Sequence, residues 1–139
     1  MSLDTSIECV LFDLDGTLID TAPDFVIALN LLLVQHGKQP LDAQLISRTV
    51  SDGAKALVSL GFGIDESTEG FTLLHEQLLA CYLKQIETTQ STLYPGMDYL
   101  LDSLEQAGIA WGIVTNKPRL YATALLTRLS LLSRCPVLI

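Results

Sequence analysis

The sequence predicts an α/β fold, in which a parallel sheet and its helices are interrupted by a helical insertion. Apolar runs at residues 9–12, 109–114 and 136–139 are short and rich in β-forming residues, which is typical of buried strands. Helical patterns at 97–107 and 119–129 alternate with the later two runs. Alternation of this kind indicates parallel strands joined by right-handed crossovers.

The first predicted strand leads into a polar sequence. Glu8 is the only polar residue in the run at 7–12. Asp13 and Asp15 follow this run directly, and a glycine and a threonine come next. Ligands of open α/β sheets bind at the carboxyl ends of the strands, so we expect the chemistry of this protein to lie here.

The segment between residues 21 and 92 is expected to contain helices and no strand. Thr21 is the predicted N-cap of its first helix, which runs to about residue 36, with Asp24 facing the free amides of the first turn. Apolar residues cover most of this helix, which predicts burial in a bundle. Gly61 is expected to end the third helix. The stripe predicted to face the core is Phe25, Ala28, Leu29, Leu32 and Leu33, and further helices are expected at 41–49, 54–60 and 71–87.

The composition excludes some classes of partner. A net charge of −8 over 139 residues argues against nucleic acid and against an anionic membrane surface, because both need a basic patch. The sequence has no apolar stretch of about 18 residues and no signal-peptide pattern, so we expect a cytoplasmic protein. Cys9, Cys81 and Cys135 are far apart and odd in number, which predicts buried, reduced thiols.

Two carboxylates at a strand end suit phosphoryl chemistry. The first, Asp13, can attack an electrophile and hold it covalently. The second, Asp15, can protonate a leaving oxygen and later activate water. Neighbouring carboxylates also attract a cation, and hard oxygen donors suit Mg²⁺, which helps an anionic nucleophile to approach a phosphate.

A second polar group is expected after the strand at 109–114. Thr115 offers a hydroxyl, and Thr115 and Asn116 offer backbone amides, just before a helix with Pro118 in its first turn. Such a combination favours anion binding. If the two strands are neighbours in a parallel sheet, Asp13 and Thr115 lie at the same edge.

These motifs resemble those of the haloacid dehalogenase-like (HAD) hydrolases. Residues 13–20, Asp-Leu-Asp-Gly-Thr-Leu-Ile-Asp, look like the first signature of that family, and residues 115–118, Thr-Asn-Lys-Pro, resemble the second. The helical insertion is similar to the α-helical cap of the family. Residues 20–24 and the second motif are most similar to phosphoglycolate phosphatases, and residues 111–114 fit the related N-acetylmuramic acid 6-phosphate phosphatases.

The resemblance implies an architecture and an activity. It implies a Rossmann-like core formed by residues 1–20 and 93–139, with the cap at residues 21–92. The implied activity is Mg²⁺-dependent hydrolysis of a phosphate monoester through an aspartyl-phosphate. The substrate would be a small phosphorylated metabolite.

The resemblance also implies roles for individual residues. Asp13 would be the nucleophile and a Mg²⁺ ligand. Asp15 would be the general acid and base, and it would bind Mg²⁺ through its backbone carbonyl. The residues that would bind the phosphate group are Gly16, Thr17, Thr115, Asn116 and Lys117.

These motifs are compatible with more than one function. The family also uses a later Lys and later Asp residues, which do not occur before Ile139, so we expect a core that is incomplete at its C-terminus. The chain could therefore be an inactive fragment or a binding module. The motifs are also compatible with an N-acetylmuramic acid 6-phosphate phosphatase and with a β-phosphoglucomutase-type phosphotransferase. The residues of the insertion that either select the substrate or lie in solvated loops are Arg48, Ser51, Gly53 and Lys55.

Overall fold

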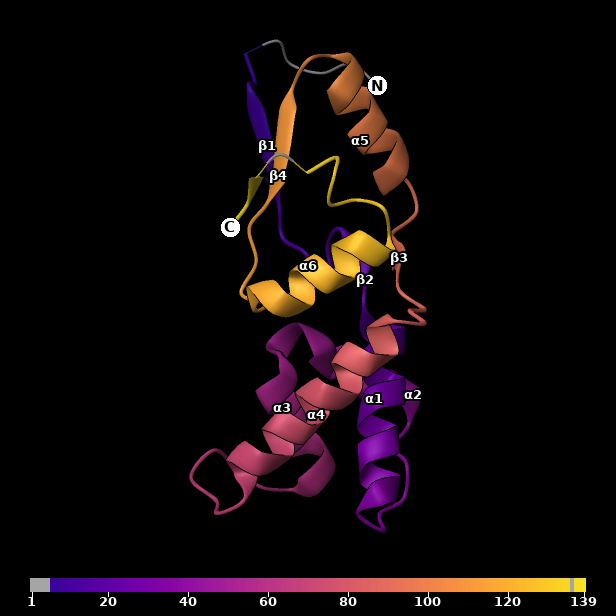
Figure 1. Cartoon of the computed structure of the whole chain (residues 1–139), viewed down its shortest axis with the longest axis vertical. Helices are drawn as coiled ribbons and strands as arrows, with labels where there is room; N and C mark the ends of the chain where they lie inside the picture. Colours follow the sequence, from indigo (N-terminus) through magenta and orange to yellow (C-terminus); the bar gives the residue numbers. More distant parts are fainter. Residues whose placement is uncertain (1–5, 136) are drawn as a thin grey trace. The chain divides into compact units, whose positions relative to one another are not determined.

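The computed structural model describes residues 6–135 and 137–139, and the chain divides into two compact units (Figure 1). One unit joins Met1–Asp20 with Thr92–Ile139 and contains the strands, and the other, Thr21–Ser91, is helical. Among the described residues, none of the helices is long and apolar enough to cross a membrane.

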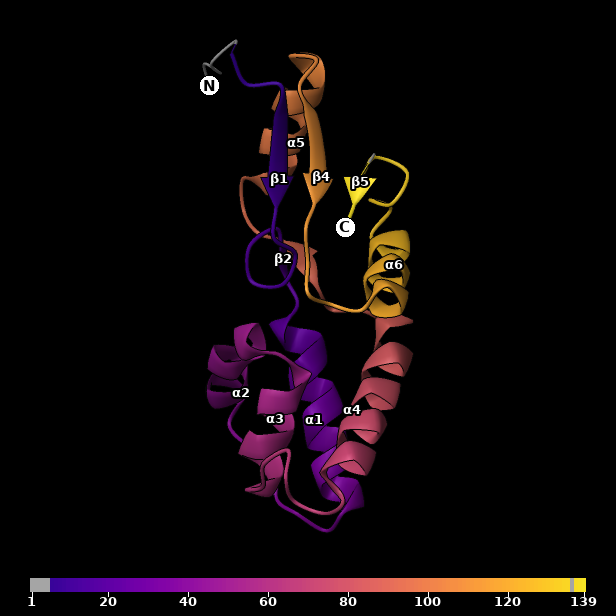
Figure 2. The same ribbon diagram turned by 90° about the vertical axis from the view of Figure 1, so that its left-hand side faces the viewer.

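The first unit is built on a parallel sheet with the strand order β1-β4-β5, and Figure 2 shows its three arrows pointing the same way. The predicted α/β class with a parallel sheet is therefore confirmed. Both crossovers move the chain in the same direction across the sheet, so right-handed connections place α5 and α6 on the same face. The elements are β1 (Cys9–Phe12), α5 (Met97–Gln106), β4 (Ala110–Ile113), α6 (Arg119–Arg128) and β5 (Val137–Leu138).

The two faces of the sheet differ in burial. On the helical face, Trp111 is buried with its ring edge-on to Phe12, 6.3 Å between centroids. On the other face, Leu11 and Val137 lie on either side of Gly112 and are 54% and 42% exposed. Cys9, in the same strand as Leu11, is also exposed, and Cys81 and Cys135 are half-buried. The prediction of buried thiols is therefore wrong, although all three cysteines are free.

A short antiparallel ribbon lies where the chain leaves the sheet unit and where it returns. Its strands are β2 (Ile19–Asp20) and β3 (Thr92–Leu93), and the amide of Tyr94 extends the pairing by donating to the carbonyl of Leu18 at 3.2 Å. No sequence pattern predicts this ribbon, because strands of two residues carry no periodicity.

The helical unit packs around α1, against which α4, α3 and α2 lie. The predicted core stripe of α1 is buried, and the ring of Phe25 stacks on that of Tyr82 at 3.9 Å. The elements are α1 (Ala22–Gln35), α2 (Ala43–Thr49), the 3-10 turn η1 (Val50–Asp52), α3 (Ala54–Phe62) and α4 (Phe71–Ile86).

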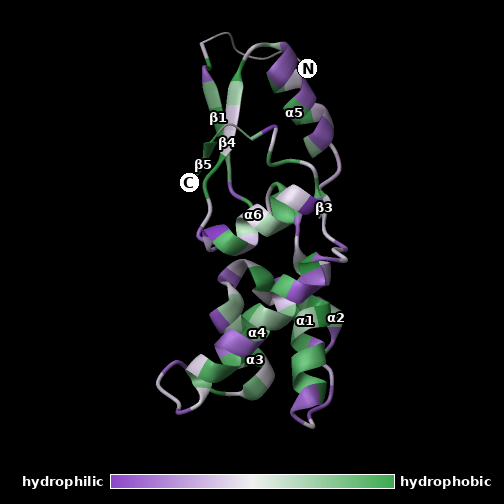
Figure 3. Ribbon diagram, viewed as in Figure 1, coloured by the Kyte–Doolittle hydropathy of each residue, from purple (hydrophilic) through white to green (hydrophobic). Residues whose placement is uncertain are grey.

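Burial of α1 on most sides is not what the structure shows. Ile27, Leu31 and Val34 form a second apolar stripe that is exposed, and Figure 3 shows hydrophobic colours along much of this helix. The bundle covers one face of α1, because the three helices packed against it come from one side of its apolar surface.

The third helix continues past its predicted end. α3 includes Gly61 and stops at Gly63, which adopts φ +66°. A side chain at position 61 would place its Cβ 3.1 Å from a methyl carbon of Leu29 and 3.3 Å from one of Leu33. Gly61 therefore allows α3 to approach α1 closely and is not a stop signal.

Asp24 has a different environment from the predicted one. It lies in the first turn of α1, but its carboxylate accepts hydrogen bonds from the end of α4 and the segment that follows. The donors are the side chains of Gln85, Thr89 and Ser91 and the amide of Gln90. Asp24 is fully buried, so it joins the beginning and the end of the helical unit.

Candidate active site

The loop after β1 is closed by its own backbone. The amide of Leu18 donates to the carbonyl of Asp13 at 3.2 Å, and the amide of Ile19 donates to the carbonyl of Leu14 at 3.1 Å. Leu14 and Leu18 are fully buried, and this anchors the loop in the core. Gly16 has φ +78°, a left-handed conformation that suits glycine. This first-motif loop is thus a fixed platform for the side chains it exposes.

Asp13 is the exposed carboxylate of this platform. Its Oδ1 accepts the amide hydrogen of Leu14 at 2.8 Å. That bond holds one carboxylate oxygen and so sets the direction of the other. Gly16 and Thr17 are also exposed in the loop.

The second motif begins at the same edge of the sheet. β1 and β4 pair in parallel with Phe12 opposite Ile113, and the amide of Val114 donates to the carbonyl of Phe12 at 2.8 Å. Thr115 therefore starts from the strand end adjacent to Asp13, so the condition for a shared edge is met.

The amides of the second motif differ from the expectation. The amide of Thr115 donates to the carbonyl of Ile139 at 3.0 Å, so this amide is used in the pairing of the two chain segments and not for an anion. α6 begins at Arg119 with Pro118 as its N-cap, so Thr115 and Asn116 precede the helix and contribute none of its first-turn amides. The polar groups that remain as candidate phosphate contacts are the Thr115 hydroxyl and the amide of the exposed Asn116.

Lys117 joins the two motifs. Its Nζ lies 2.8 Å from Oδ1 of Asp15, and the exposed fractions of the two side chains are 5% and 21%. Its backbone amide donates to Oγ1 of Thr115 at 3.0 Å. The sequence offered no signal for the ion pair, because its partners are 102 positions apart.

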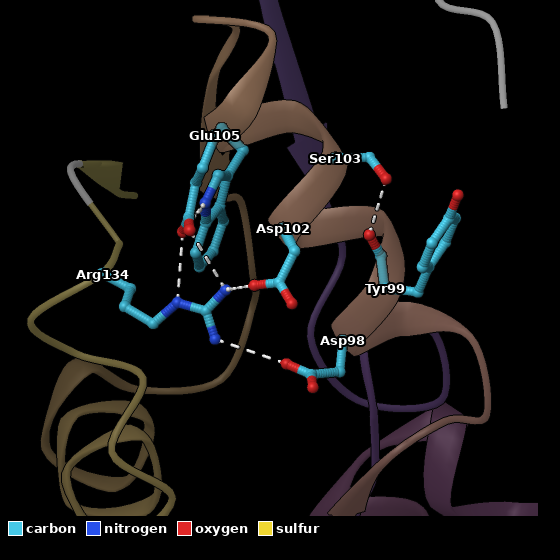
Figure 4. A network of polar contacts seen from close by, with 7 residues as sticks. Asp98, Tyr99, Asp102, Ser103, Glu105 and Arg134 are labelled. Carbon is cyan, nitrogen blue, oxygen red and sulfur yellow. Dashed lines mark hydrogen bonds and ion pairs between the residues drawn. The ribbon is translucent and has the colours of Figure 1, made fainter.

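A second polar network fixes the return of the chain to β5. Arg134 contacts Asp98, Asp102 and Glu105, which share one side of α5 (Figure 4). Glu105 also accepts the indole hydrogen of Trp111 at 3.2 Å. The hydrogen bonds that Arg134 and then Trp111 donate lower the pKa of Glu105, and donation to the Glu105 carboxylate raises the pKa of Arg134. Sequence reasoning missed this network, although the acidic side of α5 is visible in its spacing.

The candidate residues of the insertion lie in the helical unit. Arg48 donates to the carbonyl of Gln44 at 3.4 Å. Lys55 pairs with Glu66 at 3.5 Å, with both side chains more than half exposed. Ser51 lies in η1 and Gly53 follows it. These contacts assign no ligand to the four residues.

Comparisons with known proteins agree with this architecture. The model of a family described as haloacid dehalogenase-like hydrolase matches residues 10–139. An N-acetylmuramic acid 6-phosphate phosphatase of Pseudomonas putida is 38% identical over 133 residues, which are 96% of this chain and 59% of that protein. A phosphoglycolate phosphatase of Xanthomonas campestris pv. campestris is 40% identical over 134 residues, which are 94% of this chain and 58% of that protein.

A solved structure shows the same fold. A crystal structure of a predicted phosphoglycolate phosphatase from Haemophilus somnus 129PT superposes with a TM-score of 0.81 at 25% identity. The alignment covers 97% of this chain and 63% of that one. This chain thus spans less than two thirds of the length of these relatives.

Proposed function

Because the chain belongs to the haloacid dehalogenase-like hydrolase family, we propose that it hydrolyses phosphate monoesters through an aspartyl-phosphate at Asp13. The observation that carries the proposal is the edge of the sheet at which an oriented carboxylate, a second carboxylate and a threonine hydroxyl come from two adjacent strands. The named phosphatases among the relatives support the reaction class.

The first step is attack by Asp13. One carboxylate oxygen attacks phosphorus while the bond from phosphorus to the ester oxygen breaks. Asp15 donates a proton to the departing oxygen, so an alcohol leaves and the phosphoryl group stays on Asp13. The hydrogen bond from the amide of Leu14 orients the attacking carboxylate.

The second step restores Asp13. Asp15, now a carboxylate, accepts a proton from water as the water oxygen attacks phosphorus. The bond between phosphorus and Asp13 breaks, and inorganic phosphate leaves. The Thr115 hydroxyl and the Asn116 amide would bind phosphoryl oxygens, with Gly16 and Thr17 as further candidates from the first-motif loop.

The donor set fits Mg²⁺. The exposed carboxylate of Asp13 and the backbone carbonyl of Asp15 are hard oxygen donors, and Mg²⁺ commonly takes one or two carboxylates together with phosphate oxygens and waters. Across residues 6–135 and 137–139 there is no group of three or more His, Cys, Asp or Glu side chains that could hold a metal. When bound, Mg²⁺ neutralises charge between the nucleophile and the phosphate.

The substrate is proposed to be a small phosphorylated metabolite. Phosphoglycolate is the first candidate and N-acetylmuramic acid 6-phosphate the second. Relatives named as phosphatases of the one or of the other substrate match this chain at similar identity. We propose that residues 21–91 act as the α-helical cap of the family and contribute to substrate choice.

A panel assay tests this proposal. Phosphate release from phosphoglycolate, N-acetylmuramic acid 6-phosphate and glucose 1-phosphate is measured with Mg²⁺ and with EDTA. The same panel is run on this chain and on a fusion with the remaining C-terminal part of the P. putida relative. We expect Mg²⁺-dependent release from one of the first two substrates. Conversion of glucose 1-phosphate to another sugar phosphate without net phosphate release would favour a phosphotransferase, and no turnover by either protein would contradict the proposal.

A further inference from the structure

We propose that Lys117 is a positioning residue that holds Asp15 in place for proton transfer and orients the hydroxyl of Thr115. This inference rests on the proposed function, because it concerns the carboxylate assigned to proton transfer there. It assigns Lys117 a role different from the direct phosphate contact that the second motif suggests.

The burial of Lys117 is the first observation. Its side chain is only 5% exposed, and lysine is rarely buried without a charged partner. Removing an ammonium from water costs free energy unless a counter-charge and hydrogen bonds offset it. The 2.8 Å separation between Nζ and Oδ1 of Asp15 is that of a charge-assisted hydrogen bond. We therefore expect the pair to persist in solution.

The backbone of Lys117 provides the second observation. Its amide donates to Oγ1 of Thr115, while the amide of Thr115 is occupied by the carbonyl of Ile139. A threonine hydroxyl has a single hydrogen to donate. Because its oxygen already accepts from Lys117, that hydrogen is directed away from the Lys117 amide, toward an acceptor such as a phosphoryl oxygen.

Together these contacts assign Lys117 a positioning role. With Oδ1 of Asp15 held by the ammonium, the Asp15 carboxyl group keeps one orientation while it gives a proton to the leaving group and later receives one from water. Lys117 does not touch the reacting atoms in this scheme. Loss of its ammonium should misplace Asp15 and leave phosphate binding intact.

The kinetic test compares leaving groups. Lys117→Met removes the charge at similar length, and Lys84→Met changes an exposed lysine of α4 as the matched control. An alkyl phosphate such as phosphoglycolate needs protonation of its leaving oxygen, whereas p-nitrophenyl phosphate releases a stable phenolate. Lys117→Met should lower kcat/KM for phosphoglycolate about 10²-fold and that for p-nitrophenyl phosphate less than about tenfold. Asp15→Asn should show the same selectivity, and the double variant should be no worse than Asp15→Asn alone.

Two outcomes would overturn the proposal. If Lys117→Met weakens inhibition by inorganic phosphate and lowers both kcat/KM values equally, Lys117 is a phosphate ligand. If the Lys117→Met variant behaves like Lys84→Met, Lys117 has no role in the reaction. An unchanged inhibition constant for inorganic phosphate is the expected result.

A crystallographic arm separates this proposal from the proposed function. The structures of the unaltered chain and of Lys117→Met are compared at Asp15. We expect the contact between Nζ and Oδ1 in the first and a rotated carboxylate in the second. An unmoved Asp15 carboxylate in the variant would overturn the positioning role even if the chain hydrolyses no ester. An Asp13→Asn variant that keeps full activity would instead overturn the proposed function.

Discussion

Asp15 and Asp24 are both shielded carboxylates, but their surroundings differ. Asp15 lies at the edge of the sheet, remains 21% exposed and contacts an ammonium at 2.8 Å. Asp24 is fully buried in the helical unit and accepts hydrogen bonds from four uncharged donors. A carboxylate with partial access to solvent can exchange a proton with a ligand, whereas one enclosed by donors joins segments of chain. The difference separates a candidate reaction centre from a structural joint.

The largest expected effect concerns the reaction centre. Asp13→Asn replaces the proposed nucleophile with an amide that cannot attack phosphorus, so phosphate release should fall below detection. Because Asp13 is exposed, the free energy of unfolding should change by no more than about 0.5 kcal/mol. Phosphate release and urea unfolding of the same preparations give both values. A large loss of stability would mean that the loop, like Asp24, is mainly structural.

The structural joint should behave in the opposite way. Asp24→Ala leaves several buried donors without an acceptor, which should lower the free energy of unfolding by about 3 kcal/mol. Asp42→Ala, at an exposed N-cap without a side-chain cap bond, is the control and should have little effect. Urea unfolding measures the change, and hydrogen exchange should show faster opening at residues 85–91. Equal stability of the two variants would contradict the role of Asp24.

A smaller effect is expected from the backbone of the first-motif loop. Gly16→Ala meets no atom within 4 Å, but alanine at φ +78° is strained, so stability should fall by about 1 kcal/mol. Gly61→Ala is the contrasting case, because its helical backbone suits alanine while Leu29 and Leu33 oppose its methyl group. Thermal unfolding compares the stability of the Gly16→Ala and Gly61→Ala variants. A stabilising Gly16→Ala would show that the loop can relax and is no rigid platform.

The smallest effect should come from the exposed network at Arg134. Hydrogen bonds from Arg134 and Trp111 lower the pKa of Glu105 below its ordinary value of 4.5. A lowered pKa contributes stability that is present above the pKa of the unfolded chain and lost as the pH falls through that of the folded one. The stability difference between the chain and Glu105→Gln should therefore persist from pH 7 to about 5 and shrink below 4.5. Urea unfolding across this pH range measures the stability difference. A stability difference that increases as the pH falls would contradict the role of the network.

The sequence allowed prediction of the sheet and of the edge at which its two polar motifs meet. The apolar run before Asp13 and the one before Thr115 each end at a polar motif, and neighbouring parallel strands bring such ends together. Local patterns also predicted α4 and the buried stripe of α1, because both depend on helical periodicity.

The remaining contacts could not be predicted because they depend on tertiary neighbours. Asp24 occupies a position where an acidic side chain usually accepts hydrogen bonds from the first amides of its own helix. Its carboxylate accepts them from the segment after α4 instead. Gly61 serves close packing of two helices, which its local sequence does not distinguish from a helix stop. The partner of Lys117 lies in the loop after β1, far away in the sequence, so only the fold brings the two together.

Trapping the covalent intermediate tests the central claim most directly. The chain, and the fusion with the C-terminal part of the P. putida relative, are mixed with Mg²⁺ and phosphoglycolate or p-nitrophenyl phosphate, quenched in acid within the first turnover, digested and analysed by mass spectrometry. The account predicts a phosphoryl adduct on Asp13, absent from Asp13→Asn. Phosphate release without an adduct, or an adduct on another residue, would contradict it.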